Sequence, residues 1–522
     1  MTESNKISRR TALGLGLATA ASGTFLAGPA AAATGGGHHG HGHGHGGAKP
    51  KITAAFTPDT TTVLRNPLDG WALYANTSFP SDYWTQYDAV PIEGSTETAK
   101  VTDYASVYYM RVAWSLLEPS EGVYAWQSDT PIKLAIDEAR ARGLRLAFRI
   151  VVDSRDKSYN FTPDYVRDSG AQGYETQTGS TTVWSPYPDD PVFQEKFAAF
   201  IQGFAAEFGD PAVTDFIDGY GLGKWGEGHS VEYLDASNRE PVLRWIVDLY
   251  STAFPSVALA INYHRLIGTG MDWGDPDPDS ERLLDIAFDR GYVLRHDAFG
   301  MTTYYSDWEK AIAAKWRYKR PIIMEGGWVT GSMNYSVDPR GYQTVADVRK
   351  GEFDDSAEAH VNMMDFRVGE CLTWFADAYP LVQQFDGGGG YRLYPTQVVA
   401  PSTVSAAGTA DFTHTWDNLG WGYLPNNIPA WNQRYKVAIA LLASDGAAAK
   451  VFVDANSDPS TWLNGSPTSY TFKSTTLGVV KGSYRWGVAI VDTTKGSAPG
   501  IELAAQGTTT NGWLVVGDVQ VV

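Results

Sequence analysis

Two glutamates stand where apolar, strand-like runs of the sequence end. Glu227 follows the run 216–222 through a glycine-rich segment, and Glu325 directly follows the run 321–324. The carboxyl ends of parallel strands meet at one mouth of a barrel, so two such side chains can face the same bound molecule. A carboxylic acid and a carboxylate on either side of one bond are the groups that cleave glycosidic linkages. The pair therefore predicts hydrolysis of a sugar linkage. The structural alternatives are a helix N-terminal carboxylate for Glu227 and a strand-end salt bridge for Glu325.

The elements that must position this pair alternate between amphipathic helices and strands. A predicted helix is followed by a predicted strand four times. The helices are 131–142, 240–254, 280–290 and 307–318, and the strands that follow them are 144–152, 257–261, 292–294 and 321–324. Before the run 216–222, six apolar residues recur at helical spacing: Phe193, Phe197, Phe200, Ile201, Phe204 and Phe208. These units predict an α/β fold with a (β/α)8 TIM barrel over residues 52–390, because a closed barrel leaves no sheet edge. A doubly wound sheet is the alternative, but no glycine-rich phosphate-binding motif follows an early strand.

Beyond residue 390 the helical pattern gives way to short alternating runs. Apolar residues alternate with others at 435–439, 451–453, 484–490 and 513–515, and Asn464-Gly465 and Asn511-Gly512 are typical turn sequences. We expect an antiparallel β-sandwich over residues 391–522. Its aromatic residues alternate as core residues do, which favours a scaffold role over glycan binding.

The first 51 residues carry no globular pattern. Arg9 and Arg10 precede a mildly apolar stretch and the small residues 30–33, which together resemble a twin-arginine export signal peptide over residues 1–33. The apolar stretch is short and interrupted by glycine and threonine, so we expect no membrane span and a secreted, extracellular protein. Residues 34–51 form a Gly/His-rich linker whose histidines would bind metal ions loosely, without the fixed geometry of a catalytic site.

Composition narrows the function classes further. The net charge of −18 and the lack of a concentrated basic patch argue against nucleic acid as a partner. The single cysteine, Cys371, allows no intramolecular disulfide, and its apolar neighbours predict that it is buried. Asp275, Asp277 and Asp279 precede a predicted helix, where we expect them to cap its N-terminus, with Ca²⁺ binding as the alternative.

Several motifs resemble those of known families. Arg111, Trp114-Ser115, Leu117-Glu118-Pro119 and the segment 121–126 are similar to the second strand and loop of clan A glycoside hydrolases, notably the family 42 β-galactosidases. A second resemblance covers nearly the whole chain after the leader. The segments 66–71, 223–229, 295–300, 390–393 and 417–420 look like those of the bacterial family called domain of unknown function 4832. Together these resemblances imply a clan A type barrel that acts on carbohydrate.

The clan A resemblance implies roles for the two glutamates. In that clan the general acid/base ends strand four and the nucleophile ends strand seven, which by strand count are Glu227 and Glu325. Arg111 would then keep the nucleophile ionised, since a nearby guanidinium favours the charged carboxylate. One departure is Gly226, which stands where most clan members have an asparagine that binds the sugar 2-hydroxyl. Either another side chain replaces it, for which the sequence offers Asn262, His264 and His229, or Glu227 is not the acid/base.

Flat aromatic faces are typical of sugar-binding sites. Trp184, Trp225, Tyr304, Tyr305 and Trp328 fall where loops after strands should project, with core or rim packing as the alternative. Tyr304 or Tyr305 also resembles the clan A tyrosine that hydrogen-bonds to the nucleophile.

Three histidines at predicted strand ends, His229, His264 and His296, suggest one polar mouth at the catalytic face. Because no close His/Asp ligand spacing accompanies them, we predict neither a metal site nor a cofactor.

The leading hypothesis is a secreted glycoside hydrolase that cleaves a poly- or oligosaccharide by a two-glutamate retaining mechanism. An alternative is a noncatalytic carbohydrate-binding or cell-surface protein on a degenerate glycosidase barrel, for which the missing asparagine is the best argument. A metal-dependent barrel hydrolase is a third hypothesis. The sequence leaves the sugar, the linkage and the number of subunits open.

Overall fold

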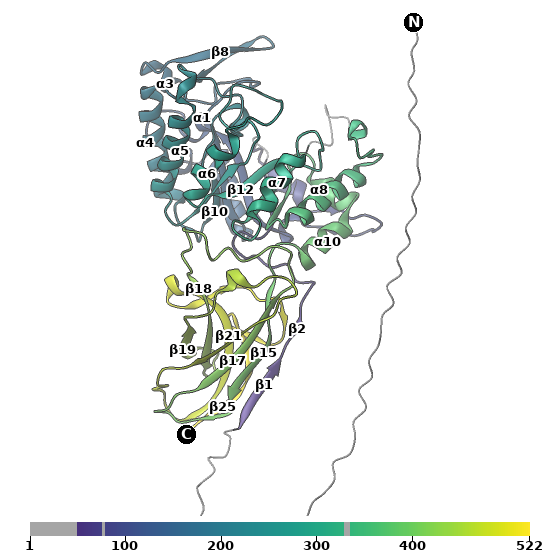
Figure 1. Ribbon diagram of the computed structural model, residues 1–522, viewed down its shortest axis with the longest axis vertical. Coiled ribbons are helices and arrows are strands. Elements are labelled where there is room, and N and C mark those ends of the chain that lie inside the picture. The colour runs from purple at the N-terminus through teal and green to yellow at the C-terminus, as the bar shows by residue number, and fades with distance from the viewer. Residues whose placement is uncertain (1–49, 76–78, 328–334) are drawn as a thin grey trace, which may run out of the picture. The chain divides into compact units, whose positions relative to one another are not determined.

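A computed structural model describes residues 50–75, 79–327 and 335–522 (Figure 1). The predicted signal peptide, most of the Gly/His-rich linker and Trp328 lie outside these described residues, so export by the twin-arginine route stays a prediction. None of the helices described is both long and apolar enough to cross a membrane.

Eight parallel strands close into a barrel, which confirms the predicted fold. In chain order they are β3 (Gly70–Tyr74), β6 (Ala105–Ala113), β7 (Arg145–Val151), β10 (Thr214–Asp218), β11 (Ala258–Asn262), β12 (Val293–Phe299), β13 (Ile322–Gly326) and β14 (Met363–Phe366). Each strand pairs with the next, and β14 pairs with β3 to complete the ring. All five residues of β10 and of β11 are buried, as expected for strands covered on both faces. Glu227 therefore follows the fourth strand, and Glu325 lies in the seventh.

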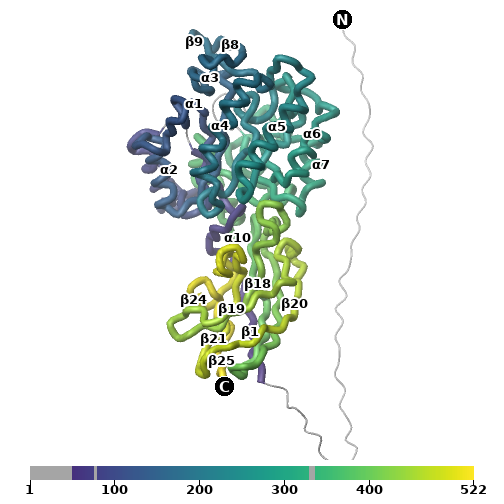
Figure 2. The backbone as a smooth tube through the Cα atoms, turned by 90° about the vertical axis from the view of Figure 1, so that its left-hand side faces the viewer, coloured from purple at the N-terminus to yellow at the C-terminus, as the bar shows by residue number. Residues whose placement is uncertain are grey.

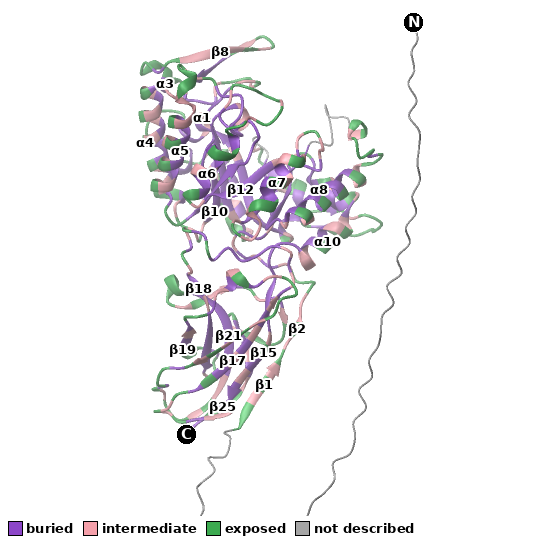
Figure 3. Cartoon of the chain, viewed as in Figure 1, coloured by how far each residue is buried: buried purple, intermediate pink, exposed green. Residues whose placement is uncertain are grey.

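Helices cover the outside of the barrel. The longer ones are α2 (Pro131–Ala141), α4 (Pro191–Phe208), α5 (Arg239–Ala253), α6 (Ser280–Asp289), α7 (Asp307–Trp316), α8 (Val345–Ala359) and α10 (Tyr379–Gly388), and the short ones are α1 (Trp114–Leu117), α3 (Asp164–Asp168) and α9 (Cys371–Ala376). In α4 the six apolar residues predicted to share a face are all buried, and Asp190 caps the helix through two backbone N–H groups. Helices α4 and α5 lie side by side (Figures 1 and 2), with exposed residues on their outer sides (Figure 3). Cys371 is buried and unpaired, as predicted.

Smaller sheets extend the loops of the barrel. A hairpin of β8 (Gly173–Thr178) and β9 (Thr181–Pro186) stands between β7 and α4, and β4 (Val90–Pro91) pairs with β5 (Thr98–Ala99). The sequence pattern had not indicated the first of these, because its residues alternate weakly between exposed and half-buried.

The C-terminal part is built from antiparallel sheets, apart from the short β16, which pairs in parallel with β25, and this confirms the predicted sandwich. One sheet has the order β1 (Lys51–Ala55), β15 (Leu393–Pro401), β17 (Asp411–Asn418) and β20 (Thr468–Lys473). The other follows β16 (Thr403–Val404), β25 (Trp513–Val521), β21 (Gly482–Asp492), β18 (Tyr435–Leu442) and β19 (Ala448–Asp454), with β22 (Ala498–Ile501) and β24 (Thr509–Thr510) beside it, while β2 (Thr57–Pro58) pairs with β23 (Ala505–Gln506). Trp416, Trp462 and Trp486 are fully buried in the core of this part.

The N-terminal limit predicted for the barrel needs adjustment. Residues 51–55 form β1, which pairs along its whole length with β15 of the sandwich, from Lys51 opposite Pro401 to Ala55 opposite Gln397. Strand β2 likewise pairs with β23. The first residues of the predicted 52–390 barrel segment thus belong to the C-terminal sheets, to which they contribute β1 and β2.

Candidate active site

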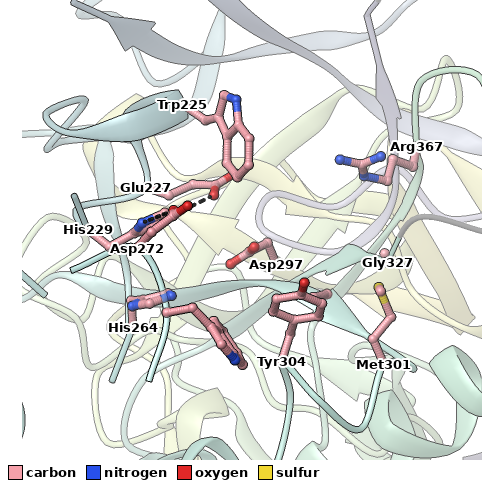
Figure 4. A pocket seen from close by; sticks show the side chains of 13 residues that line it. Trp225, Glu227, His229, His264, Asp272, Asp297, Met301, Tyr304, Gly327 and Arg367 are labelled. Carbon is pink, nitrogen blue, oxygen red and sulfur yellow. Dashed lines mark hydrogen bonds and ion pairs between the residues drawn. The ribbon is translucent and has the colours of Figure 1, made fainter. Parts of the chain in front are cut away.

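The carboxyl ends of β10 to β14 contribute the lining of a cavity of about 130 Å³ (Figure 4). Five of the predicted site residues line it: Trp225, Glu227, His229, His264 and Tyr304. Asp272, Trp273, Asp297 and Arg367, to which the sequence analysis gave no role, line it as well. The ends of separate strands therefore bring together most of the predicted polar mouth.

The loop after β10 carries Glu227 through an unusual backbone. Gly223, Trp225, Gly226 and Gly228 all have left-handed φ angles, between 57° and 83°. At Gly226 a Cβ atom would stand 3.1 Å from Val151 and 3.2 Å from the Cδ atom of Arg149. Glycine meets both conditions, because it has no Cβ and adopts positive φ at little cost. This crowding is a physical reason for the departure from asparagine at position 226.

Glu227 is 4% exposed and is held from two sides. Its Oε1 accepts hydrogen bonds from Nη1 of Arg111 at 3.0 Å and Nη1 of Arg149 at 3.4 Å. Its Oε2 lies 3.4 Å from Nε2 of His229. Asn262 donates through Nδ2 to the backbone carbonyl of Glu227 at 3.1 Å, so the amide fixes the loop.

Glu325 is fully buried among four arginines at the end of β13. Its Oε2 accepts from Nη2 of Arg295 at 2.8 Å and Nη2 of Arg149 at 3.4 Å. Its Oε1 lies 3.9 Å from Nη1 of Arg111 and 3.8 Å from Nε of Arg367. Burial would raise the pKa of Glu325, but these four guanidinium groups lower it to about 2. Glu325 is therefore ionised at neutral pH, as predicted, with Arg295 and Arg149 as the stronger causes and Arg111 as a weaker one.

One nitrogen atom fixes how far apart the two glutamates can be. Nη1 of Arg111 lies 3.0 Å from Oε1 of Glu227 and 3.9 Å from Oε1 of Glu325. The two oxygens are thus at most about 7 Å apart, a limit that includes the separation of about 5 to 5.5 Å typical of retaining glycosidases. Glu325 itself does not line the cavity, but the next two residues, Gly326 and Gly327, do.

A buried ion-pair network supports both glutamates from inside the barrel. Asp218 accepts from Nε of Arg149 at 2.7 Å and from the hydroxyl of Tyr109 at 2.7 Å, and it lies 3.3 Å from Nε of Arg295. The guanidinium of Arg295 also stacks over the ring of Tyr109 at 4.1 Å. No pattern in the sequence gave Arg149, Arg295 or Asp218 a role in the site. The available signal was charge inside apolar strands, since charged residues are almost never fully buried unless paired.

The three histidines do lie together. The rings of His229 and His264 stack at 4.6 Å, and those of His264 and His296 are parallel at 6.2 Å. Burial, followed by the neighbouring His229, lowers the pKa of His264 well below its usual range, so this imidazole is neutral. Within the described residues, no three His, Cys, Asp or Glu side chains are grouped so that they could hold a metal ion.

The predicted aromatic residues separate into two groups. Trp225 and Tyr304 line the cavity, where Tyr304 packs edge-on against Trp273 at 4.3 Å. Tyr305 is buried against Phe299, and Trp184, a residue of β9, is buried in the main hydrophobic core. Neither Tyr304 nor Tyr305 hydrogen-bonds to Glu325 in the described part of the chain, so nothing here supports the tyrosine role that the resemblance implied.

No known family model matches the chain, and no curated protein matches it in sequence, so both family resemblances stay predictions. Similar solved structures include the endo-β-1,4-mannanase from Thermotoga petrophila, with a TM-score of 0.38 and 11% identity over 88% of this chain and 98% of that one. The intracellular xylanase TsXylA from Thermoanaerobacterium saccharolyticum has a TM-score of 0.38 and 12% identity over 57% and 86% of the two chains. Endo-glycoceramidase II from Rhodococcus sp. has a TM-score of 0.35 and 12% identity over 81% and 99%. Identities of this size do not carry an activity over to this chain.

Proposed function

We propose that this protein is a glycoside hydrolase that uses Glu227 as the general acid/base and Glu325 as the nucleophile of a retaining reaction. One observation carries the proposal: Arg111 spans two carboxylates, one in the loop after the fourth strand and one at the end of the seventh, and limits their separation to about 7 Å. Carboxyl groups more than about 10 Å apart would have met neither glycosidase geometry. The aromatic side chains beside Glu227 are suited to the apolar face of a sugar.

The environment of Glu325 suits a nucleophile. Its pKa of about 2 leaves it charged, and its Oε1 has no hydrogen bond to any described residue. In the first step Oε1 would bond to the anomeric carbon while the bond to the leaving oxygen breaks and Glu227 gives that oxygen its proton. In the second step Glu227 would take a proton from water, whose oxygen replaces Glu325 on the sugar and frees the carboxylate.

The test compares wild type with Glu325→Gln and Glu227→Gln on aryl glycosides and polysaccharides, with released sugar as the readout. We expect Glu325→Gln to lose about 10³-fold or more in kcat, because the amide cannot attack. Glu227→Gln should lose less on aryl glycosides with good leaving groups than on polysaccharides, because a good leaving group needs no proton.

The matched control is Glu121→Gln, which removes a carboxylate that is exposed and pairs with Lys196 at 2.8 Å. It should turn over like wild type. Full activity of a folded Glu325→Gln protein would contradict the assignment of the nucleophile.

A second candidate function is noncatalytic carbohydrate binding. It is favoured by the complete burial of Glu325 among four arginines, which is also what a strand-end ion pair looks like. Glycan binding by wild type without any release of sugar would support this function and contradict the first. Chelator treatment belongs in the same experiment, because activity that survives it removes the metal-dependent hypothesis.

A further inference from the structure

We propose that Asp297 is a third functional carboxylate of the cavity and accepts hydrogen bonds from hydroxyl groups of the bound sugar. The inference rests on the proposed function, because it takes a carbohydrate to be the occupant. Asp297 lies in the segment 295–300, which carried one of the motif resemblances and to which the two-glutamate mechanism gives no role.

An irregular end of β12 turns Asp297 toward the cavity. The pairing of β12 with β13 shifts register between His296 and Phe299, and Ala298 has a left-handed φ of 61°. Such a φ is disfavoured for alanine because its Cβ crowds the following carbonyl oxygen. Backbone of this kind persists where its surroundings hold it, and it is concentrated at functional sites. The Asp297 side chain is 24% exposed and lines the cavity, whereas Glu325 is wholly buried.

One amide couples Asp297 to Glu227. Nδ2 of Asn262 donates to Oδ1 of Asp297 at 3.1 Å and to the backbone carbonyl of Glu227 at 3.1 Å. The second carboxylate oxygen of Asp297, Oδ2, has no hydrogen bond to any residue that the structure describes. In Figure 4 this carboxylate points into the space that the labelled side chains surround. Asp297 is thus held at one oxygen and open at the other.

The surroundings keep Asp297 charged. Burial would raise the pKa of its carboxyl group, but the positive charge that the His296, His264 and His229 rings carry when protonated, together with the permanent charge of Arg149, holds the pKa below its usual range. Arginine keeps its charge at every pH relevant here, so part of this effect does not depend on the histidines. An ionised carboxylate is an acceptor only, and hydrogen bonds to it are about twice as strong as those between neutral groups. Sugar hydroxyls are the donors that such an acceptor fits.

Neighbouring side chains suit the same ligand. Trp273 is 37% exposed at the cavity and packs against Tyr304, which gives an apolar face beside the carboxylate. A pyranose has an apolar face and a rim of hydroxyl groups, so stacking on the aromatic side chains would present its hydroxyls to Asp297. Because Asn262 fixes both Asp297 and the Glu227 loop, these hydroxyls would belong to the sugar next to the bond that is cut.

The test measures glycan affinity where turnover is blocked. Calorimetric titration of an oligosaccharide panel into Glu325→Gln gives the reference Kd, and the same titration follows for Glu325→Gln combined with Asp297→Asn, Asp297→Glu or Asp289→Asn. Asp289→Asn is the control, because Asp289 is an exposed carboxylate at the end of α6. If the Glu325→Gln protein does not unfold cooperatively, Glu227→Gln serves as the background.

We expect Asp297→Asn to weaken binding about 10- to 100-fold, because it removes charged hydrogen bonds. Asp297→Glu, which keeps the charge, should bind more tightly than Asp297→Asn but more weakly than the background protein. Asp289→Asn should leave Kd unchanged. Unchanged affinity in Asp297→Asn, or an equal loss in Asp289→Asn, overturns this inference alone. A background protein that binds no glycan of the panel overturns it together with the carbohydrate function. Hydrolysis by wild type with unchanged affinity in Asp297→Asn would leave the proposed function standing.

Discussion

At the scale of single residues, Gly226 shows how the backbone positions the two glutamates. The Arg149 side chain against which it packs contacts Asp218, Glu227 and Glu325 together. We expect Gly226→Asn to lower activity about 10- to 100-fold, because a displacement of Arg149 misplaces both carboxylates. Stability should fall by about 1–2 kcal/mol through overpacking. Initial rates and urea unfolding measure the two effects.

Gly341→Asn is the matched control for this prediction. Gly341 has the same φ, +74°, as Gly226, but nothing lies within 4 Å of where its Cβ would stand. The control therefore carries the cost of a left-handed asparagine without the steric one. An equal loss of activity in both variants would show that φ, and not Arg149, explains glycine at position 226.

A second residue-scale prediction concerns the proton of Glu352, a residue of α8, the helix that packs against the seventh strand. Glu352 is fully buried, with one oxygen paired to Arg349 and the other without a hydrogen-bond partner among described residues. Burial raises the pKa of Glu352 from 4.5 to about 8. The folded protein thus keeps a proton that the unfolded chain has released. This contribution to stability is complete below about pH 4.5 and is lost as the pH rises through about 8.

We therefore expect Glu352→Gln to reduce the fall in unfolding free energy between about pH 5 and about pH 9, by on the order of a few kcal/mol. Burial and the negative Glu325 also raise the pKa of Asp365, to about 7. Asp365 therefore lowers the unfolding free energy over the same pH range, and this decrease remains in Glu352→Gln. Urea unfolding across this range is the measurement, with the exposed Asp354→Asn as control. Parallel curves for wild type and Glu352→Gln would show that Glu352 releases its proton at ordinary pH.

At the scale of elements, the end of β12 stores strain in a single alanine. A left-handed alanine costs about 1–2 kcal/mol, and glycine relieves that cost while adding about 0.5–1 kcal/mol of unfolded-state entropy. We expect Ala298→Gly to stabilise the protein by up to about 1 kcal/mol. Ala287→Gly in α6 should destabilise it by at least about 1 kcal/mol, because Ala287 is both helical and fully buried. Thermal unfolding compares the two. A loss of stability in Ala298→Gly would mean that the Cβ of Ala298 packs usefully.

The elements that the sequence predicted are those with one dominant periodicity. The buried stripe of α4 and the apolar strands β10 and β11 follow from local pattern. By contrast, the register shift in β12 depends on pairing with β13, which no local pattern encodes. The role of Arg149 in β7 and Arg295 in β12 depends on closure of the barrel, which brings both side chains to Asp218. The glutamate pair could be proposed from the sequence because the position of each glutamate after an apolar run is a local property. The side chains that surround the pair come from separate strands, which the local pattern does not relate.

At the scale of the whole molecule, the C-terminal sandwich is tied to the amino ends of the barrel strands. Asp69, which precedes β3, accepts from the backbone N–H of Tyr391 at 2.8 Å. Asn362, which precedes β14, donates through Nδ2 to the carbonyls of Leu68 at 3.1 Å and Tyr423 at 2.8 Å. The cavity lies at the opposite, carboxyl ends. In such barrels the carboxyl ends of the strands usually carry the active site, and the amino ends contribute to stability. Contacts at the amino ends therefore agree with the scaffold role expected for the sandwich.

The two parts should therefore unfold together. Asn362 is fully buried and bridges them, whereas the exposed Asn464 donates its Nδ2 to two carbonyls within the C-terminal part alone. We expect Asn362→Ala to lower the unfolding free energy by about 2–4 kcal/mol, because it leaves buried carbonyl groups unpaired. Asn464→Ala should cost less than about 1 kcal/mol, since water can replace its bonds. Calorimetry should give one transition in every variant, shifted mainly by Asn362→Ala. Two transitions, of which only the first moves, would show that the barrel unfolds on its own and that the sandwich does not support it.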